Sequence, residues 1–312
     1  MHDNHSAETL APPAPREILD VATHDGAVIR LCRHGNAAGP RLVLSHGNGF
    51  AIDAYWPFWR LLCEGFDVVV FDFRNHGQNP RHRIEDHNYP NFARDLDAVW
   101  QATMARWGKK PAAGLFHSMS AIASIVQLAD IGKRWDALVL FDPPLFPPEG
   151  HPLYDNALGL EQRLARWATG RPERFKDPEE LAAQFRQNRT MQRWVPGTHE
   201  LLARSILRPE PASGDWVLAC PPAFESQVYL SNITLGAWPR LAKMPRSTKL
   251  ICSDPALKDA GPPAFTGRDA ARFFGIAYEA IPETSHMLQI ERPGACVAAA
   301  LSFLDGCGIR SA

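Results

Sequence analysis

The sequence lacks a long hydrophobic run. No stretch of the 312 residues approaches the roughly 18 uncharged apolar residues that a membrane-spanning helix needs. The first 15 residues are polar and rich in proline, and they contain no apolar segment of the kind found in secretory signal peptides. We therefore expect a soluble, unexported, cytoplasmic protein without a membrane span.

An excess of charge of one sign is also missing. The chain has 33 Lys and Arg against 34 Asp and Glu, which leaves a formal net charge of −1. Nucleic acids and anionic membranes are bound by clustered excess Lys and Arg, so the composition argues against both partners. Because 45% of the residues are hydrophobic and 21% are charged, the chain has enough apolar surface to bury a core.

Residue patterns that hold metals or disulfides are absent too. The six cysteines are scattered, mostly in apolar surroundings, and no pair has C-x-x-C spacing. This indicates reduced, buried thiols rather than a disulfide framework or a zinc site. The twelve histidines include no H-E-x-x-H motif or other ligand pair at helical spacing. We predict no metal and no cofactor.

What the sequence contains is an alternation of apolar runs and helical patterns. A hairpin is predicted over residues 17–34, around the turn pair Asp25–Gly26. Helical patterns, the clearest at 91–107, separate several of the later runs. The alternation predicts an α/β fold, a mostly parallel twisted sheet with helices on both faces. The apolar runs typical of strands buried on both faces lie at 41–47, 66–72, 112–118, 137–142, 249–254 and 276–283.

One connection is far longer than an ordinary loop. It spans residues 143–247 and carries helix-start signals at Pro178, Thr198 and Pro222. Its tryptophans and other apolar residues allow it a small core of its own. We predict a helical cap at 143–247, inserted into a core of residues 17–142 and 248–312, with a flexible N-terminal segment at residues 1–16.

A candidate nucleophile stands at the junction of a predicted strand and a predicted helix. A sharp turn there holds the Oγ of Ser118 clear of the sheet, at the N-terminus of the helix. Such a turn favours small residues two positions before and after the nucleophile. Ser120 meets that condition, whereas Phe116 stands where glycine is usual. Ser120 is a rival nucleophile, and an ordinary helix-capping serine is the structural alternative.

Two further segments supply partners for such a serine. His286 lies on the loop after the last predicted strand, where it can reach back over the sheet edge and act as general base. The turn Gly47–Asn48–Gly49 follows the first parallel strand, and its glycines allow backbone N–H groups to point into a pocket. We predict an oxyanion hole from the N–H groups of Asn48 and Met119, with a simple β-turn as the alternative.

On these residues the chain resembles the α/β-hydrolase superfamily. The resemblance implies an α/β-hydrolase fold, a helical cap over the site, and a Ser–acid–His triad in that chain order. The chain departs from the family pattern at Phe116, Ser120 and Asn79. The segments that carry the resemblance cover most of residues 17–305: His46–Phe50, Asp72–Asn79, His117–Met119, and His286 followed by Glu291–Pro293. We interpret Asp72–Asn79 as a structural turn in which His76 is hydrogen-bonded locally.

The acid of the triad stays open at this point. The family usually places it in a loop after a late strand, where this chain has Asp254 and Asp259. A smaller group places it directly after an earlier strand, where this chain has Asp142. Any of the three could orient His286 by accepting its Nδ1 proton. A turn-forming Asp–Pro pair is the structural alternative for Asp142 and Asp254.

The leading hypothesis is a cofactor-independent serine hydrolase of the carboxylic ester hydrolase type. It would cleave an ester, thioester or lactone through an acyl-enzyme on Ser118. Carbon–carbon bond hydrolysis and acyl transfer on the same triad stay open, because fold and triad do not separate them. A small-molecule-binding homologue without turnover is the alternative from another class. The aromatic and apolar content of the cap predicts a small-molecule substrate with a hydrophobic acyl or aromatic group.

Overall fold

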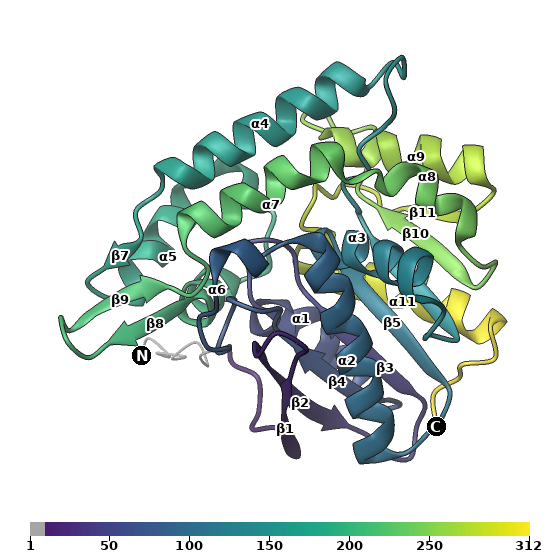
Figure 1. The fold of residues 1–312 in the computed structure, drawn as a ribbon, viewed down its shortest axis with the longest axis horizontal. Coiled ribbons are helices and arrows are strands. Elements are labelled where there is room, and N and C mark those ends of the chain that lie inside the picture. The colour runs from purple at the N-terminus through teal and green to yellow at the C-terminus, as the bar shows by residue number, and fades with distance from the viewer. Residues whose placement is uncertain (1–9) are drawn as a thin grey trace, which may run out of the picture.

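One eight-stranded sheet runs through the structure, a computed structural model that describes residues 10–312 (Figure 1). Its strand order is β1-β2-β4-β3-β5-β6-β10-β11. Strands β1 (Glu17–Ala22) and β2 (Val28–Gly35) form the predicted antiparallel hairpin, and β2 also pairs antiparallel with β4. The other strands are parallel to their neighbours: β3 (Arg41–Ser45), β4 (Asp67–Phe71), β5 (Ala112–His117), β6 (Ala137–Phe141), β10 (Thr248–Cys252) and β11 (Ala277–Ala280).

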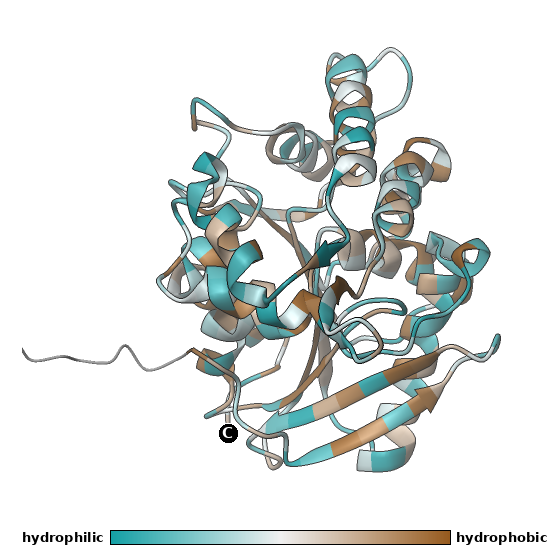
Figure 2. Ribbon diagram, turned by 90° about the vertical axis from the view of Figure 1, so that its left-hand side faces the viewer, coloured by the Kyte–Doolittle hydropathy of each residue, from teal (hydrophilic) through white to brown (hydrophobic). Residues whose placement is uncertain are grey.

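The central strands are buried on both faces, as the apolar runs predict. Alternation of side chains along β3 places Leu42 and Leu44 in one hydrophobic cluster and Val43 in the other. The hairpin at the sheet edge is different, because every second residue of β1 is exposed. In Figure 2 the strands of this hairpin carry both hydrophilic (teal) and hydrophobic (brown) residues. The predicted α/β sheet is therefore confirmed.

Helices cover both faces of the sheet. Side chains of α1 (Trp56–Trp59) and α11 (Pro293–Gly306) join the cluster that contains Leu42. Side chains of α2 (Tyr89–Trp107), α3 (Met119–Val126) and α9 (Pro262–Phe274) join the cluster that contains Val43. The remaining short elements here are α10 (Leu288–Glu291), the 3₁₀ helices η1 (Ile52–Tyr55), η2 (Arg60–Leu62) and η3 (Ile84–Asp86), and the π-helical turn η4 (Gln127–Ile131).

The long connection between β6 and β10 forms a layer at one end of the sheet (Figure 1). Its helices are α4 (Tyr154–Gly170), α5 (Pro178–Gln187), η5 (Arg189–Met191), α6 (Thr198–Ile206), α7 (Pro222–Leu235), α8 (Ala237–Arg240) and η6 (Leu241–Lys243). Helix α5 begins at its predicted proline, and the Asp177 side chain accepts a hydrogen bond from the Glu180 N–H at 3.0 Å. Trp238 of α8 packs into the core cluster beside α3, so the last part of the connection lies against the sheet.

The connection also contains a small antiparallel sheet that the sequence did not predict. Its order is β7-β9-β8, formed by Arg174–Phe175, Asp215–Leu218 and Leu207–Glu210. Strands of two to four residues are too short to show a period of two in the sequence. The turn between β8 and β9 depends on Gly214, whose φ of +76° is a conformation that favours glycine.

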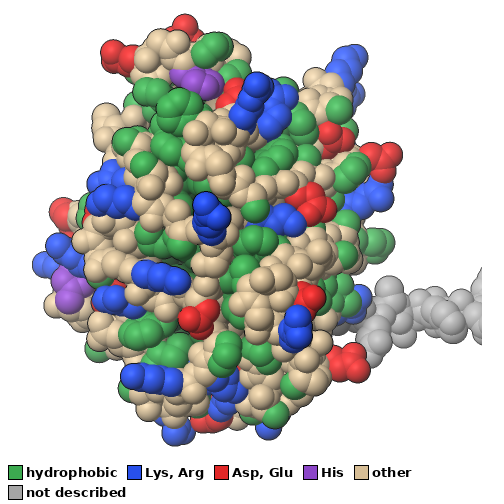
Figure 3. Space-filling view, turned by 90° about the vertical axis from the view of Figure 1, so that its right-hand side faces the viewer, with side chains coloured by type: hydrophobic (Ala, Val, Ile, Leu, Met, Phe, Trp, Pro, Cys, Tyr) green, Lys and Arg blue, Asp and Glu red, His purple; other side chains and the backbone are tan. Residues whose placement is uncertain are grey.

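Three predictions from the sequence concern the N-terminal segment, membrane-spanning helices and the distribution of surface charge. Of the segment 1–16 that we predicted to be flexible, residues 1–9 lie outside the described residues. At the start of the described part, the Leu10 carbonyl accepts a hydrogen bond from Arg204 at 2.9 Å. Within residues 10–312, no helix combines the length and the apolar character that crossing a bilayer requires. On the face drawn in Figure 3, Lys and Arg are scattered among acidic and uncharged groups.

Candidate active site

Ser118 links β5 to α3 through a strained backbone conformation. Its φ of 53° and ψ of −115° lie in a region that residues other than glycine rarely adopt. The sharp turn brings the side chain to the wall of a cavity. The N–H groups of the first turn of α3 lie directly behind it and have no acceptor within the helix. This is the strand-to-helix turn that the sequence predicts for a nucleophilic serine.

The residues around the turn explain how Phe116 is accommodated. Its ring packs against Trp135 and lies over Gly114, where an added Cβ would stand 2.3 Å from a ring carbon. The space that the turn needs is therefore supplied by Gly114 rather than by a small residue at 116. Ser120 is fully buried, and its Oγ accepts a hydrogen bond from the His117 N–H at 2.8 Å. Ser120 thus closes the turn and does not line the cavity.

His286 connects Ser118 to Asp142. Its Nε2 lies 3.0 Å from the Ser118 Oγ, and its Nδ1 lies 2.7 Å from Oδ2 of Asp142. Because a carboxylate only accepts, Nδ1 carries the proton and Nε2 is the acceptor for the serine hydroxyl. The second carboxylate oxygen of Asp142 accepts hydrogen bonds from both the N–H and the Oγ of Ser253, each at 3.0 Å. Ser253 was not found by sequence reasoning.

Asp254 and Asp259 do not contact His286, which corrects their inclusion as candidate acids. The Asp254 carboxylate accepts backbone N–H groups from Ala256 at 2.8 Å and from Glu283 at 2.9 Å. Asp259 forms an exposed ion pair with Arg193 at 3.0 Å. Asp254 therefore ties its loop to the loop that carries His286, and Asp259 ties its loop to Arg193. The carboxylate of Asp142, directly after β6, is held by Ser253, which follows the neighbouring strand β10, whereas the carboxylate of Asp254 is taken up by backbone N–H groups.

The side chain of Glu291 anchors the loop that carries His286. The Glu291 carboxylate accepts hydrogen bonds from the N–H of Ser285, at 2.6 Å, and from its hydroxyl. Burial raises the pKa of Glu291, and the hydrogen bonds from Ser285 oppose that shift. Glu291 belongs to the segment Glu291–Pro293, which is one of those that carry the family resemblance. Its role in the structure is to hold Ser285, the residue before His286.

A second chain of hydrogen bonds joins the Gly47 turn, η1 and the loop that carries His286. The Gly47 N–H donates to the Tyr55 hydroxyl at 3.1 Å, and this hydroxyl lies 2.7 Å from Nδ1 of His117. Nε2 of His117 lies 2.9 Å from the carbonyl oxygen of His286. The carbonyl can only accept, so Nε2 of His117 carries the proton and Tyr55 donates to Nδ1. Burial lowers the pKa of His117 well below its ordinary value, which keeps the ring neutral. Tyr55 gave no signal in the sequence.

The turn predicted to form the oxyanion hole is packed tightly against the serine. An added Cβ at Gly47 would lie 3.2 Å from the Ser118 Cβ, so a larger residue would push the turn away. The Asn48 side chain leaves the turn and donates a hydrogen bond at 2.8 Å to the backbone carbonyl of Glu225 on α7. Backbone N–H groups of Asn48 and Met119 both belong to residues that line the cavity. The cap therefore contacts this turn directly.

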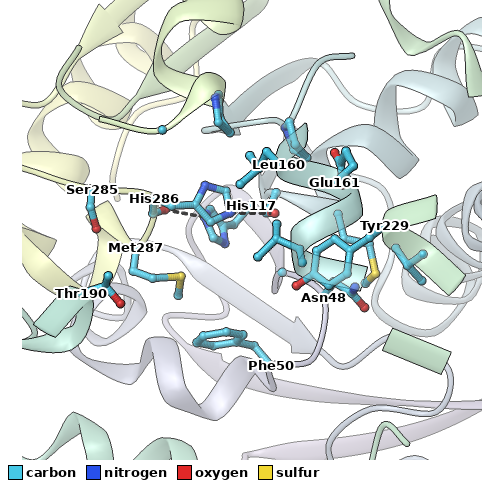
Figure 4. A pocket seen from close by; sticks show the side chains of 18 of the residues that line it. Asn48, Phe50, His117, Leu160, Glu161, Thr190, Tyr229, Ser285, His286 and Met287 are labelled. Atoms are coloured by element: carbon cyan, nitrogen blue, oxygen red, sulfur yellow. Dashed lines mark hydrogen bonds between the residues drawn. The ribbon is translucent and has the colours of Figure 1, made fainter. Parts of the chain in front are cut away.

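The cavity has a volume of about 410 Å³ and lies between the sheet edge and the cap. Figure 4 shows His286 and His117 between the side chains of Ser285 and Met287 on one side and those of Asn48 and Tyr229 on the other. Most of the wall is apolar. Its cap residues include Leu160, Glu161, Leu164 and Trp167 from α4, Met191 and Trp194, and Val228, Tyr229 and Asn232 from α7.

The turn after β4 has the structural role that we predicted. Nδ1 of His76 donates to the Arg74 carbonyl at 3.0 Å, and Nε2 accepts the Gly49 N–H at 3.2 Å. The Asn79 side chain donates to the Asp72 carbonyl at 2.6 Å. His76 therefore supports the glycine turn beside Ser118 from below.

All six cysteines are free thiols, and each group of side chains that could hold a metal includes a residue that already has other partners. Within the described residues, one candidate group needs the His76 nitrogens, which are already hydrogen-bonded, and the other needs Asp25, which pairs with Arg74 at 2.6 Å. The two groups are His76, His87 and Cys220, and Asp25, His82 and Asp86.

A parallel sheet with a serine on a strained turn, a histidine loop and a buried aspartate defines a hydrolase of the α/β class. A family model described as "Alpha/beta hydrolase family" matches residues 42–299. The chain therefore belongs to the alpha/beta hydrolase family, and the fold predicted from the sequence is confirmed.

Solved structures of other hydrolases share this fold. An E-2-(acetamidomethylene)succinate hydrolase matches with a TM-score of 0.76 and 17% identity, over 93% of this chain and 99% of that chain. A thioesterase domain from the curacin biosynthetic pathway has a TM-score of 0.69 and 18% identity, over 92% and 99%. An N-formylmaleamic acid deformylase from Pseudomonas putida has a TM-score of 0.65 and 19% identity, over 91% and 100%. At these identities the likeness concerns the fold.

Proposed function

We propose that the protein is a cofactor-independent serine hydrolase that cleaves an ester, thioester or lactone bond through an acyl-enzyme on Ser118. The observation that carries this proposal is the continuous hydrogen-bonded chain from the Ser118 Oγ through His286 to Asp142, at the wall of a largely apolar cavity. A serine hydroxyl is a weak nucleophile unless a neighbouring base accepts its proton, and Nε2 of His286 is placed to do so.

The reaction follows from the positions of these groups. Nε2 of His286 accepts the hydroxyl proton while the Ser118 Oγ attacks the substrate carbonyl carbon. The oxyanion that forms is stabilised by the N–H groups of Asn48 and Met119. The imidazolium then gives its proton to the leaving group, which departs and leaves the acyl-enzyme. A water molecule, deprotonated by His286, releases the acid and restores the serine. Asp142 holds the Nδ1 proton and stabilises the imidazolium.

The cavity supports a small-molecule substrate with a hydrophobic acyl or aromatic group. Its volume lies within the range of roughly 300–1,000 Å³ that is usual for small-molecule sites. Leu164, Trp194 and Val228 give it apolar walls. A thioesterase domain among the similar folds makes a thioester a bond to include in the test.

The proposal is tested by labelling the protein with a fluorophosphonate probe and by assaying p-nitrophenyl esters and acyl thioesters. Ser118→Ala should abolish labelling and lower kcat on the order of 10⁴-fold or more, as removal of a triad nucleophile does elsewhere. Ser124→Ala is the matched control, because its Oγ lies one to two turns further along α3 and donates to the Ala121 carbonyl at 2.7 Å. A folded wild-type protein that neither labels nor turns over any ester would indicate a binding homologue instead.

A further inference from the structure

The cap side of the cavity contains one carboxyl group. Glu161 lies on α4, lines the same cavity as Ser118 and is only 4% exposed. Among the described residues that line this cavity, it is the one Asp, Glu, Lys or Arg. Figure 4 shows it beside Leu160, away from Ser285 and Met287 at the histidine loop. A single carboxyl in an otherwise apolar wall requires an explanation, because burying it is unfavourable.

The neighbours of Glu161 supply a hydrogen bond to only one of its two carboxyl oxygens. Its Oε1 accepts a hydrogen bond from Nδ2 of Asn232 at 2.6 Å, and the same Nδ2 donates to the Pro144 carbonyl at 2.8 Å. Both partners are acceptors, so the orientation of the Asn232 amide is fixed and its Oδ1 is left buried without a donor. The Oε2 of Glu161 has no hydrogen-bond partner, and no Lys or Arg pairs with it, within the described part of the chain.

Another buried glutamate of the cap shows what a satisfied carboxyl looks like in this protein. Glu225 on α7 is 2% exposed, and it pairs with Arg171 at 2.6 Å. Glu161 is buried to a similar degree, and no Lys or Arg of residues 10–312 pairs with it. Burial accordingly raises the pKa of Glu161 to about 7, although the Asn232 hydrogen bond and the charge of His286 oppose the shift. The missing partner of Glu161 is therefore expected to arrive with the ligand that fills the cavity.

We propose that Glu161 and Asn232 form a recognition site for a protonated amine on the part of the substrate that lies away from the scissile carbonyl. This inference rests on the proposed hydrolase function and narrows its substrate class to esters or thioesters with an apolar chain and an amino group. An ammonium group brings a positive charge and donors for Oε2 of Glu161 and Oδ1 of Asn232. Tyr89 and Tyr229 line the same cavity, and aromatic rings also favour a cation.

The test uses p-nitrophenyl esters of straight-chain acids with four to eight carbons, each ending in a methyl, hydroxyl, ammonium or carboxylate group. The readout is the ratio of kcat/KM between the ammonium ester and the methyl ester of equal length, after subtraction of the uncatalysed rate. The wild type should favour the ammonium ester at its best length by about tenfold to hundredfold. Glu161→Gln keeps an acceptor for Asn232 but removes the charge, so this ratio should fall at least about tenfold.

Glu149→Gln is the matched control, because Glu149 is an exposed residue of the loop before α4. It should keep the wild-type ratio, whereas Glu161→Gln should also improve the carboxylate ester relative to the methyl ester. A wild type that favours the ammonium ester at no length, or that favours the hydroxyl ester instead, would overturn the proposal. So would a Glu161→Gln protein with an unchanged ratio, even if Ser118→Ala abolishes turnover and the hydrolase function stands.

If the wild type hydrolyses no ester, the proposed function fails and the amine site is tested by binding alone. Isothermal titration of the folded protein with hexylamine and with hexan-1-ol then gives the answer. Hexylamine that binds at least about tenfold more tightly than hexan-1-ol, with the difference lost in Glu161→Gln, supports the site. Equal binding of the two compounds to the wild type overturns it.

Discussion

The polar groups around His286, on the sheet side of the cavity, and those around Glu161, on the cap side, differ in how they are paired. On the sheet side, both oxygens of Asp142 have donors, and the backbone carbonyl of His286 is held by His117. On the cap side, Glu161 and Asn232 each keep an oxygen without a donor among the described residues. A closed network is ready before any substrate arrives, which is what electrostatic preorganisation requires. An open network is completed by a ligand. The contrast supports our two proposals, that the sheet side supplies the chemistry and that the cap side selects the substrate.

The two sides are nevertheless joined at the Gly47–Asn48–Gly49 turn. The Asn48 side chain donates to the Glu225 carbonyl of α7, and an added Cβ at Gly49 would lie 2.6 Å from the Glu225 carboxylate. Arg171 holds that carboxylate in place. Exchanging the whole cap would therefore disturb the turn that carries the Asn48 N–H as well as the substrate pocket. A point substitution such as Glu161→Gln changes the substrate pocket and leaves the contacts between the cap and the Asn48 turn in place.

The largest effect should come from breaking the closed network at its acid. Asp142→Asn exchanges an acceptor for a donor opposite Nδ1 of His286, which favours the wrong tautomer. We expect kcat to fall on the order of 10²- to 10⁴-fold with the fold intact, by analogy with the triad template. Asp259→Asn is the control and should stay within about threefold of wild type, because the Asp259 carboxylate is exposed and pairs with Arg193, away from His286. Equal losses in both variants would contradict the assignment of Asp142.

A second effect should appear in the pH dependence of stability, because Glu161 is buried and no Lys or Arg of the described residues pairs with it. Its pKa of about 7 in the folded protein lies above the ordinary value of 4.5. Between these values the folded state binds more protons than the unfolded state, so the contribution of Glu161 to the free energy of unfolding falls as pH rises. Relative to wild type, Glu161→Gln should therefore gain on the order of 2 kcal/mol between pH 5 and pH 8.

Urea unfolding of both proteins at several pH values measures this difference. Burial also raises the pKa values of Asp53, to about 7, and of Asp72, to about 6. These two groups titrate in both proteins and cancel in the comparison. A difference in the free energy of unfolding that stays constant from pH 5 to pH 8 would show that Glu161 titrates normally, and the contrast between the two cavity walls would weaken.

The smallest effect should come from removing one hydroxyl of the second chain of hydrogen bonds, the one that includes Tyr55 and His117. Tyr55→Phe leaves the Gly47 N–H and Nδ1 of His117 without partners while the aromatic ring stays. We expect kcat to fall about tenfold with little change in KM, since the loop that carries His286 and the Gly47 turn lose a shared anchor. Tyr278→Phe is the control, because the Tyr278 hydroxyl is buried without a partner. Similar losses of kcat in the two variants would show that Tyr55 does not position the site.

The sequence determined much of the fold because its signals are local. Buried parallel strands are nearly continuous apolar runs, α2 covers its predicted range of 91–107, and α5 begins at its predicted proline. The strands of the small β7-β9-β8 sheet were not predicted, because segments of two to four residues are too short to show the alternation of apolar and polar residues that marks a strand. Ser118 and His286 were predictable as candidates for a similar reason, since Ser118 stands at the end of one predicted strand and His286 on the loop after another.

Only the tertiary structure decided which groups meet. The sequence offered Asp142 and Asp254 on equal terms, and in the structure Asp142 lies against His286 while Asp254 accepts backbone N–H groups of Ala256 and Glu283. In the same way, the space for Phe116 comes from Gly114, two residues earlier on the same face of β5. Tyr55 and Glu161 carry no motif, because their roles come from contacts with residues far away along the chain. Local sequence patterns determine where helices and strands form. The distances between catalytic side chains depend on how those elements pack, and for that reason only the tertiary structure shows which side chains can react together.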